Sequence, residues 1–163
     1  MKFQLCNQLE AADCGPACIK MIAAHYRKNI SLSLLKEYCN VTRLGISSKD
    51  VVDGCEKIGM TGRVFHLSIE KVRQMPLPAI LYWRQGHYVV LYEVKKRKGE
   101  YTYSIADPGF GKVKLNEQEL LQDWSTDGET GIVILVEPTD EFYKLENEKY
   151  HTKLSTIFEP FKH

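Results

Sequence analysis

The chain has 163 residues, enough for one compact domain but too few for two domains of ordinary size. Its 22 Lys and Arg residues nearly balance 21 Asp and Glu residues, which excludes a sequence-wide basic field for nucleic acid or an anionic membrane. Hydrophobic residues at 44% and charged residues at 26% exclude a disordered chain. Five cysteines cannot all pair with one another, and the sequence has no C-x-x-C or Cys/His cluster. We therefore expect a reducing compartment, at least one free thiol, no metal and no cofactor.

The first third of the chain carries helical patterns. After residues 13–16, apolar positions recur at spacings of three and four and predict an amphipathic helix that runs to Tyr26. A shorter helix is expected over residues 33–39. Residues 47–50, Ser-Ser-Lys-Asp, have the form of a capping box and predict a third helix, which Gly59 would end.

Short strands are expected from Thr61 onward, separated by turn residues and interrupted by two short helices. The predicted strands are 63–66, 79–82, 87–94, 101–106, 112–115 and 132–136, and the helices are 68–74 and 116–123. Helices first and strands afterwards predict an α+β fold, with N-terminal helices packed on a mostly antiparallel β-sheet.

The sequence contains no signal for membrane insertion. No apolar run approaches the roughly 18 residues that a membrane-spanning helix needs. Residues 1–8 lack the apolar run and cleavage site of a secretory signal, so we predict a cytosolic chain. Residues 139–163 are polar with scattered aromatic residues and are predicted to form a tail or linker.

Cys14 is the candidate nucleophile. It lies just before the first predicted helix, where free backbone N–H groups and the helix dipole stabilise an anion and lower the pKa of the thiol. Free cysteines are more often small packing residues. That interpretation is preferred for the other four, Cys6, Cys18, Cys39 and Cys55.

A nucleophilic thiol needs a base, and His87 is the best placed of the five histidines because it begins a strong strand after a glycine. Asp107 ends the next predicted strand. On neighbouring antiparallel strands its carboxylate would meet the imidazole and hold its tautomer. Gln8 lies six residues before Cys14, and its carboxamide is a candidate oxyanion donor. Taken singly, each of these residues has an ordinary structural explanation.

Together the four residues form a recognisable pattern. Residues 8–18 read Gln-x4-Asp-Cys-Gly-x-Ala-Cys, residues 86–91 read Gly-His-Tyr-Val-Val-Leu, and residues 106–108 read Ala-Asp-Pro. This pattern resembles the papain-like double-glycine leader peptidases that open bacteriocin-exporting ATP-binding cassette transporters. The resemblance covers roughly residues 1–140.

The resemblance implies a papain-like cysteine peptidase domain over residues 1–138 and a linker over residues 139–163 toward an absent transmembrane domain. The roles it implies are Cys14 as nucleophile, His87 as general base, Asp107 as the residue that orients the imidazole, and Gln8 as oxyanion donor. The domain would lie on the cytoplasmic side of the bacterial plasma membrane. It would remove leaders from bacteriocin or lantibiotic-type precursors after a Gly-Gly pair, coupled to export.

The implied partners are the precursor peptide, whose leader would dock as an amphipathic helix, and the membrane and nucleotide-binding domains of a parent transporter. No nucleic acid partner is expected. The sequence has no G-x-x-x-x-G-K-[ST] motif, so it is either an excised peptidase domain, which the tail favours, or a stand-alone peptidase.

Three alternatives remain. A non-catalytic relative that only docks transporter substrate would typically lack the nucleophile or base, whereas this chain retains both. An amidase or transglutaminase-like enzyme would share the fold, but the Gln-x4-Asp-Cys spacing argues against it. The basic run at residues 95–98 suggests a binding module, yet it lies between two predicted strands and is better interpreted as a solvated hairpin loop.

Overall fold

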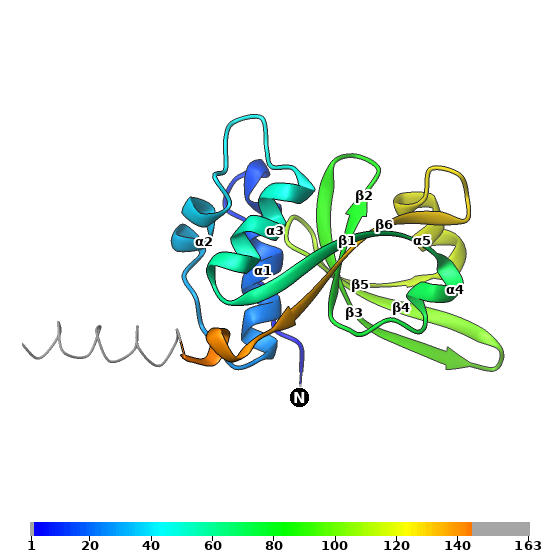
Figure 1. The fold of residues 1–163 in the computed structure, drawn as a ribbon. Coiled ribbons are helices and arrows are strands. Elements are labelled where there is room, and N and C mark those ends of the chain that lie inside the picture. The colour runs from blue at the N-terminus through cyan, green and yellow to red at the C-terminus, as the bar shows by residue number, and fades with distance from the viewer. Residues whose placement is uncertain (1, 145–163) are drawn as a thin grey trace, which may run out of the picture.

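The computed structural model describes residues 2–144 (Figure 1). The helical elements are η1 (Ala11–Asp13), α1 (Cys14–His25), α2 (Leu32–Tyr38), α3 (Ser48–Lys57), α4 (Ile69–Val72) and α5 (Glu117–Trp124). The strands are β1 (Met60–Ser68), β2 (Ala79–Trp83), β3 (His87–Arg97), β4 (Glu100–Asp107), β5 (Gly111–Asn116) and β6 (Thr130–Pro138).

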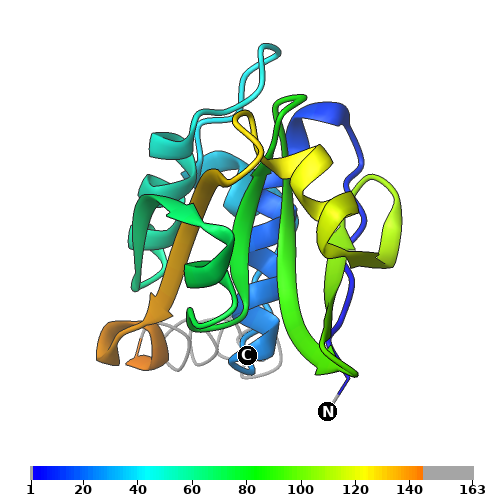
Figure 2. The ribbon, with the colours of Figure 1, turned by 90° about the vertical axis from the view of Figure 1, so that its right-hand side faces the viewer.

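All six strands form one antiparallel sheet in the order β1-β6-β2-β3-β4-β5. Helices α1 to α3 cover one face, and α4 and α5 pack on the other. Figure 2 shows α1 behind the central strands and α5 in front of them. The predicted α+β class, with N-terminal helices on a mostly antiparallel sheet, is confirmed.

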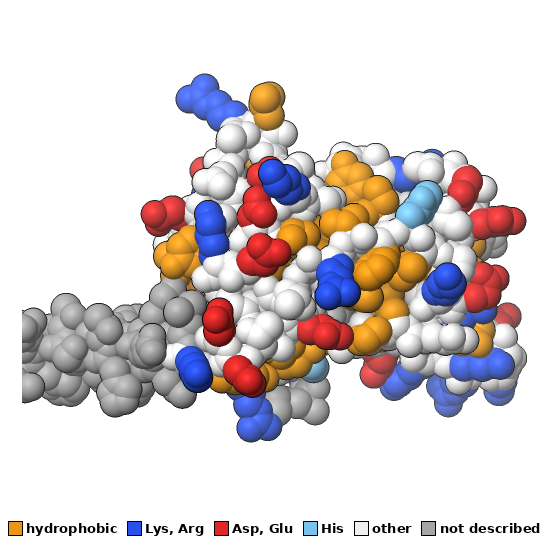
Figure 3. Space-filling view, in the orientation of Figure 1, with side chains coloured by type: hydrophobic (Ala, Val, Ile, Leu, Met, Phe, Trp, Pro, Cys, Tyr) orange, Lys and Arg blue, Asp and Glu red, His pale blue; other side chains and the backbone are white. Residues whose placement is uncertain are grey.

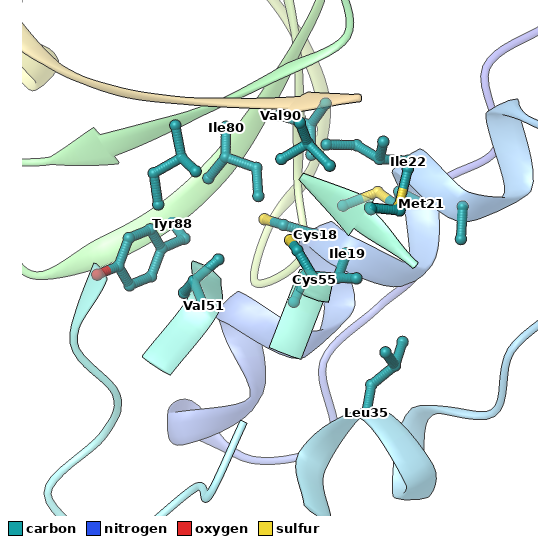
Figure 4. Packing of buried hydrophobic residues seen from close by; sticks show 14 of the residues in the cluster. Cys18, Ile19, Met21, Ile22, Leu35, Val51, Cys55, Ile80, Tyr88 and Val90 are labelled. Carbon is teal, nitrogen blue, oxygen red and sulfur yellow. The ribbon is translucent and has the colours of Figure 1, made fainter. Parts of the chain in front are cut away.

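The three N-terminal helices bury an apolar cluster against the sheet (Figure 4). Cys18 and Cys55 are fully buried within it, beside Ile80 and Val90 from the central strands. Cys39 is also fully buried, and a Cβ at Gly54 would collide with its sulfur. The prediction that these three cysteines are packing residues is confirmed.

Two predicted helix starts are confirmed at the level of hydrogen bonds. Ser47 and Asp50 form a reciprocal capping box at the start of α3, and Asn116 and Glu119 form another at the start of α5. Each box satisfies backbone N–H groups that a helix start leaves without partners. Gly59, at a φ of +84°, follows the end of α3 as predicted.

The basic run lies in a β-hairpin, as predicted, but residues 95–97 extend strand β3 and are not part of the loop. Strand β3 continues through Arg97, and the turn is made by Lys98 and Gly99, both at positive φ. The side chains of residues 95–98 are exposed. Positive φ at both central residues gives the turn the backbone twist that antiparallel strands require.

The packed part of the chain extends past residue 138. Thr139 donates its N–H to the Gly59 carbonyl at 3.1 Å, and Phe142 is fully buried in the helical cluster. The ammonium of Lys28 lies 4.0 Å from the centroid of the Phe142 ring. The predicted tail therefore does not begin at 139, because residues 139–144 pack on the domain. The rest of that prediction, over 145–163, lies outside the described residues. Among residues 2–144, no helix is long and apolar enough to cross a bilayer.

Candidate active site

Cys14 is the first residue of α1, directly after the turn η1. Its side chain lies at the edge of the helical cluster and is 6% exposed. Burial opposes formation of the thiolate, but hydrogen bonds with the His87 side chain and with the backbone of Tyr88 and Gly15 favour it. The favourable interactions outweigh burial, so the pKa of the Cys14 thiol lies below its ordinary value.

His87 begins β3 and Asp107 ends β4, and the two neighbouring strands bring their side chains together. His87 Nε2 lies 2.5 Å from Asp107 Oδ1. The hydrogen bond to Asp107, followed by that to Cys14, raises the pKa of His87 from 6.5 to about 9 despite burial. A raised imidazole pKa beside a lowered thiol pKa favours a thiolate–imidazolium pair.

The carboxylate of Asp107 is itself held by the turn that follows it. The backbone N–H of Gly109 donates to Asp107 Oδ1 at 2.9 Å, and that of Phe110 donates to the Asp107 carbonyl at 3.1 Å. The same oxygen that faces His87 is therefore fixed in place from the opposite side. A carboxylate held in this way keeps the imidazole of His87 in one tautomer and one orientation.

Gln8 lies beside this group, where the N-terminal segment crosses the turn after β4. Its backbone N–H donates to the Pro108 carbonyl at 2.9 Å, and its side-chain Nε2 donates to the Glu10 carbonyl at 3.1 Å. A Cβ on Gly109 would lie 3.3 Å from Gln8 Oε1 and 3.5 Å from His87 Cε1. The carboxamide is thus next to the imidazole, and its N–H donates to a backbone carbonyl.

The structure therefore brings all four predicted site residues into one place. A thiolate at a helix start, an imidazolium paired with a carboxylate and a nearby carboxamide donor are the components of acyl transfer through a covalent thioester. The model for the family described as Peptidase C39 family matches residues 2–141. The chain belongs to that family. The predicted class of enzyme, a papain-like cysteine peptidase that hydrolyses peptide bonds, is confirmed at the level of the family.

Relatives and solved structures agree with this C39 assignment. The chain is 32% identical over 149 residues to the colicin V secretion/processing ATP-binding protein CvaB of Escherichia coli. It is 33% identical over 157 residues to the lactococcin-G-processing and transport ATP-binding protein LagD of Lactococcus lactis. These matches take in 91% and 93% of this chain but 20% and 21% of the relatives, so the chain spans about a fifth of their length.

Among solved structures, a double glycine motif protease from an AMS/PCAT transporter, in complex with a leader peptide, superposes with a TM-score of 0.75. It is 28% identical, over 85% of this chain and 93% of that one. The peptidase domain of Streptococcus ComA superposes with a TM-score of 0.74 at 21% identity, over 85% of this chain and all of that one, and shows the shared fold.

Sequence reasoning gave no role to two residues near this site, Asp13 and Lys36, although Asp13 belongs to the Gln-x4-Asp-Cys motif. Asp13 is fully buried beside Cys14, accepts the Glu10 N–H at 3.0 Å and lies 3.2 Å from the Lys36 ammonium. It closes a capping box with Glu10, and the acid at the third position after Glu10 was the available signal. Lys36 lies on α2, and no local sequence pattern indicates that it pairs with Asp13.

A second feature near the site is an exposed apolar surface on the β1-β6-β2 side of the sheet, beyond the edge of α1 and α3. We call its members Val64, Tyr82 and Ile132 the apolar sheet surface, since the strand register places these three side chains on one face of the sheet. They line a cleft of about 460 Å³. Figure 3 shows hydrophobic side chains gathered over this part of the sheet. Tyr82 pairs with Tyr88, the residue after His87, so the surface reaches the catalytic group.

Proposed function

We propose that this chain is the peptidase domain of a bacteriocin-type export transporter, and that it removes a precursor's leader by cleaving after a Gly-Gly pair. The observation that carries the proposal is the Cys14–His87–Asp107 group, in which both pKa shifts favour a thiolate–imidazolium pair. The names of the relatives support an export system, and a parent transporter would place the domain on the cytoplasmic side of the membrane.

The Cys14 thiolate attacks the carbonyl carbon of the second glycine, and the carbonyl electron pair moves to the oxygen. This oxyanion is stabilised by the Cys14 backbone N–H and by Gln8 Nε2 once it turns from the Glu10 carbonyl. The intermediate collapses as the C–N bond breaks, and His87 gives its proton to the leaving amine. The leader is then held on Cys14 as a thioester.

Water completes the cycle. Neutral His87 takes a proton from water while the oxygen attacks the thioester, and the Cys14 thiolate leaves. This step restores the imidazolium and releases the leader with a free carboxylate. Asp107 stabilises the charged ring in both half-reactions and keeps the nitrogen that faces Cys14 available. Glycine at both positions suits a narrow slot, because a slot that excludes Cβ atoms rejects other residues.

The leader is proposed to dock as an amphipathic helix on the apolar sheet surface. Val64, on the edge strand β1, is 46% exposed, and Tyr82 and Ile132 on the same face are partly exposed. Apolar side chains clustered in this way mark contact sites, and a helix places its own apolar residues in such a groove. The solved relative in complex with a leader peptide supports the kind of partner.

The catalytic proposal is tested with a precursor peptide whose leader ends in Gly-Gly, followed by mass spectrometry of the products. Cys14→Ala is expected to abolish cleavage and still bind the peptide, measured by fluorescence anisotropy. Cys6→Ala, a half-buried thiol outside the site, serves as the matched control. Cleavage by Cys14→Ala would refute the mechanism, cleavage at another dipeptide would refute the specificity, and binding without cleavage by the unmodified chain would favour the docking-domain alternative.

The docking proposal has a separate test. Val64→Asp is expected to raise KM at least tenfold and change kcat little, because the charge disrupts helix docking away from the thiol. Leu44→Asp is the control, since Leu44 is 99% exposed on the loop between α2 and α3. An unchanged KM in Val64→Asp would place the leader elsewhere and leave the catalytic proposal standing.

A further inference from the structure

Two exposed apolar side chains flank the catalytic group on the side away from the apolar sheet surface. Leu9 directly follows Gln8 and is 81% exposed, and Phe110 follows the Asp107-Pro108-Gly109 turn and is 80% exposed. Together we call them the apolar rim. Single exposed apolar residues are ordinary on protein surfaces. These two are distinguished by their place, because each is carried by a loop that also holds a proposed catalytic residue.

One backbone hydrogen bond joins the two loops, and another closes the β4–β5 turn on itself. The Gln8 N–H donates to the Pro108 carbonyl at 2.9 Å, and the Phe110 N–H donates to the Asp107 carbonyl at 3.1 Å. The absence of a side chain at Gly109 brings the loops close enough for contact with the Gln8 carboxamide. The backbone that carries the rim is therefore held beside the catalytic group.

The strand order separates the apolar rim from the leader's proposed surface. His87 lies on β3, with β2, β6 and β1 on one side and β4 and β5 on the other. The apolar sheet surface belongs to the first side, and Phe110 ends the β4–β5 turn on the second. Consider a precursor whose leader lies over the first side and whose scissile bond lies at Cys14. The residues after the scissile bond then extend over the second side, toward β4 and β5. Extended chain advances about 3.3–3.6 Å per residue, so the first residues after the cut are the ones that pass the rim.

We propose that Leu9 and Phe110 bind the side chains of the first one or two residues after the scissile bond, and that they favour apolar residues there. The inference rests on the proposed function and extends it to the part of the precursor that becomes the mature peptide. We assign the apolar rim to a segment of the substrate because the rim is continuous with the catalytic group through Gln8 and Asp107.

The experiment uses two peptides with the same Gly-Gly leader, one with Leu and one with Ser directly after the cut, and compares kcat/KM by mass spectrometry. The unmodified chain is expected to prefer the Leu peptide by about five- to tenfold, at the low end of pocket selectivity because the rim is open. In the double variant Leu9→Ser with Phe110→Ser, this ratio is expected to fall to about one. Leu44→Ser, at a leucine that is 99% exposed on a separate loop, should keep the ratio.

The outcomes separate the two proposals. Cleavage after Gly-Gly with equal kcat/KM for both peptides would overturn the apolar rim and leave the proposed function intact. A preference for Leu that survives in the double variant would also overturn it. If the ratio survives while the double variant converts a dimer into a monomer in ultracentrifugation, the rim is a contact between copies and not a substrate site. No cleavage of either peptide would overturn the proposed function, and the rim with it.

Discussion

The charge on Asp107 determines the pH up to which His87 stays protonated, and Asp107→Asn tests this directly. The hydrogen bond to Asp107 is the largest contribution to a His87 pKa of about 9. The protonated ring is the form that gives a proton to the leaving amine. Lowering the pKa of His87 therefore removes the active form at a lower pH. The alkaline limb of the kcat/KM profile should move down in the variant.

The size of the effect follows from the geometry. The rise from 6.5 to about 9 corresponds to roughly 3 kcal/mol of preferential stabilisation of the imidazolium. Asparagine keeps an oxygen that accepts from Nε2–H but loses the charge, and neutral hydrogen bonds are about half as strong as charge-assisted ones. The alkaline limb in Asp107→Asn is therefore expected about one pH unit lower. Asp107→Ala, which removes the acceptor as well, should move it by up to about two units.

The assay is kcat/KM between pH 5 and pH 10 on a Gly-Gly leader substrate, because this ratio reports ionisations of the free enzyme. Asp140→Asn removes the same charge at an exposed position outside the site and is the matched control. An alkaline limb that stays in place in both Asp107 variants would refute the assignment. It would show that another group sets the protonation of His87.

Three further predictions concern the surroundings of the thiol. Gly109→Ala should lower kcat about tenfold with little change in Tm, because the new Cβ, 3.3 Å from Gln8 Oε1, would displace the proposed oxyanion donor; an unchanged kcat would argue against that role for Gln8. Asp13→Ala should lower the free energy of unfolding by about 2–4 kcal/mol in urea, since it strips Lys36 of its buried partner; a loss below about 1 kcal/mol would contradict this. Iodoacetamide at pH 6 should label Cys14 before Cys18, whose thiol pKa is raised well above normal by burial; uniform labelling in peptide maps would contradict a lowered Cys14 pKa.

The predictable part of the fold was local. Capping residues such as Ser47 and Asn116 satisfy helix starts within three residues, and strand alternation is a period-two pattern, so both are visible in the chain. The strand order β1-β6-β2-β3-β4-β5 was not predicted, because pairing across such separations depends on burial of whole faces. The packing of Phe142 under Lys28 was missed for the same reason, since a polar stretch concealed one fully buried ring.

The residues that meet at the site could be predicted more completely than the strand order, because the site motifs place reactive residue types at fixed spacings. The resemblance supplied the roles of Cys14, His87, Asp107 and Gln8, and the antiparallel pairing of β3 with β4 brings two of them within 2.5 Å. The state of the Gln8 carboxamide was beyond sequence reasoning. Its donation to the Glu10 carbonyl depends on where a three-residue turn places one backbone oxygen.

Asp13 is adjacent to Cys14 in the sequence, yet its carboxylate does not orient the histidine. One of its oxygens accepts the Glu10 N–H, and the other lies 3.2 Å from the Lys36 ammonium. A second carboxylate directed at the imidazole would place like charge beside the thiolate and raise the pKa of Cys14. Paired with Lys36, the buried charge instead holds the Glu10 peptide, whose carbonyl accepts from Gln8 Nε2. The two acids therefore contact different parts of the site: Asp107 holds His87, the proposed base, and Asp13 holds the peptide next to Gln8, the proposed oxyanion donor.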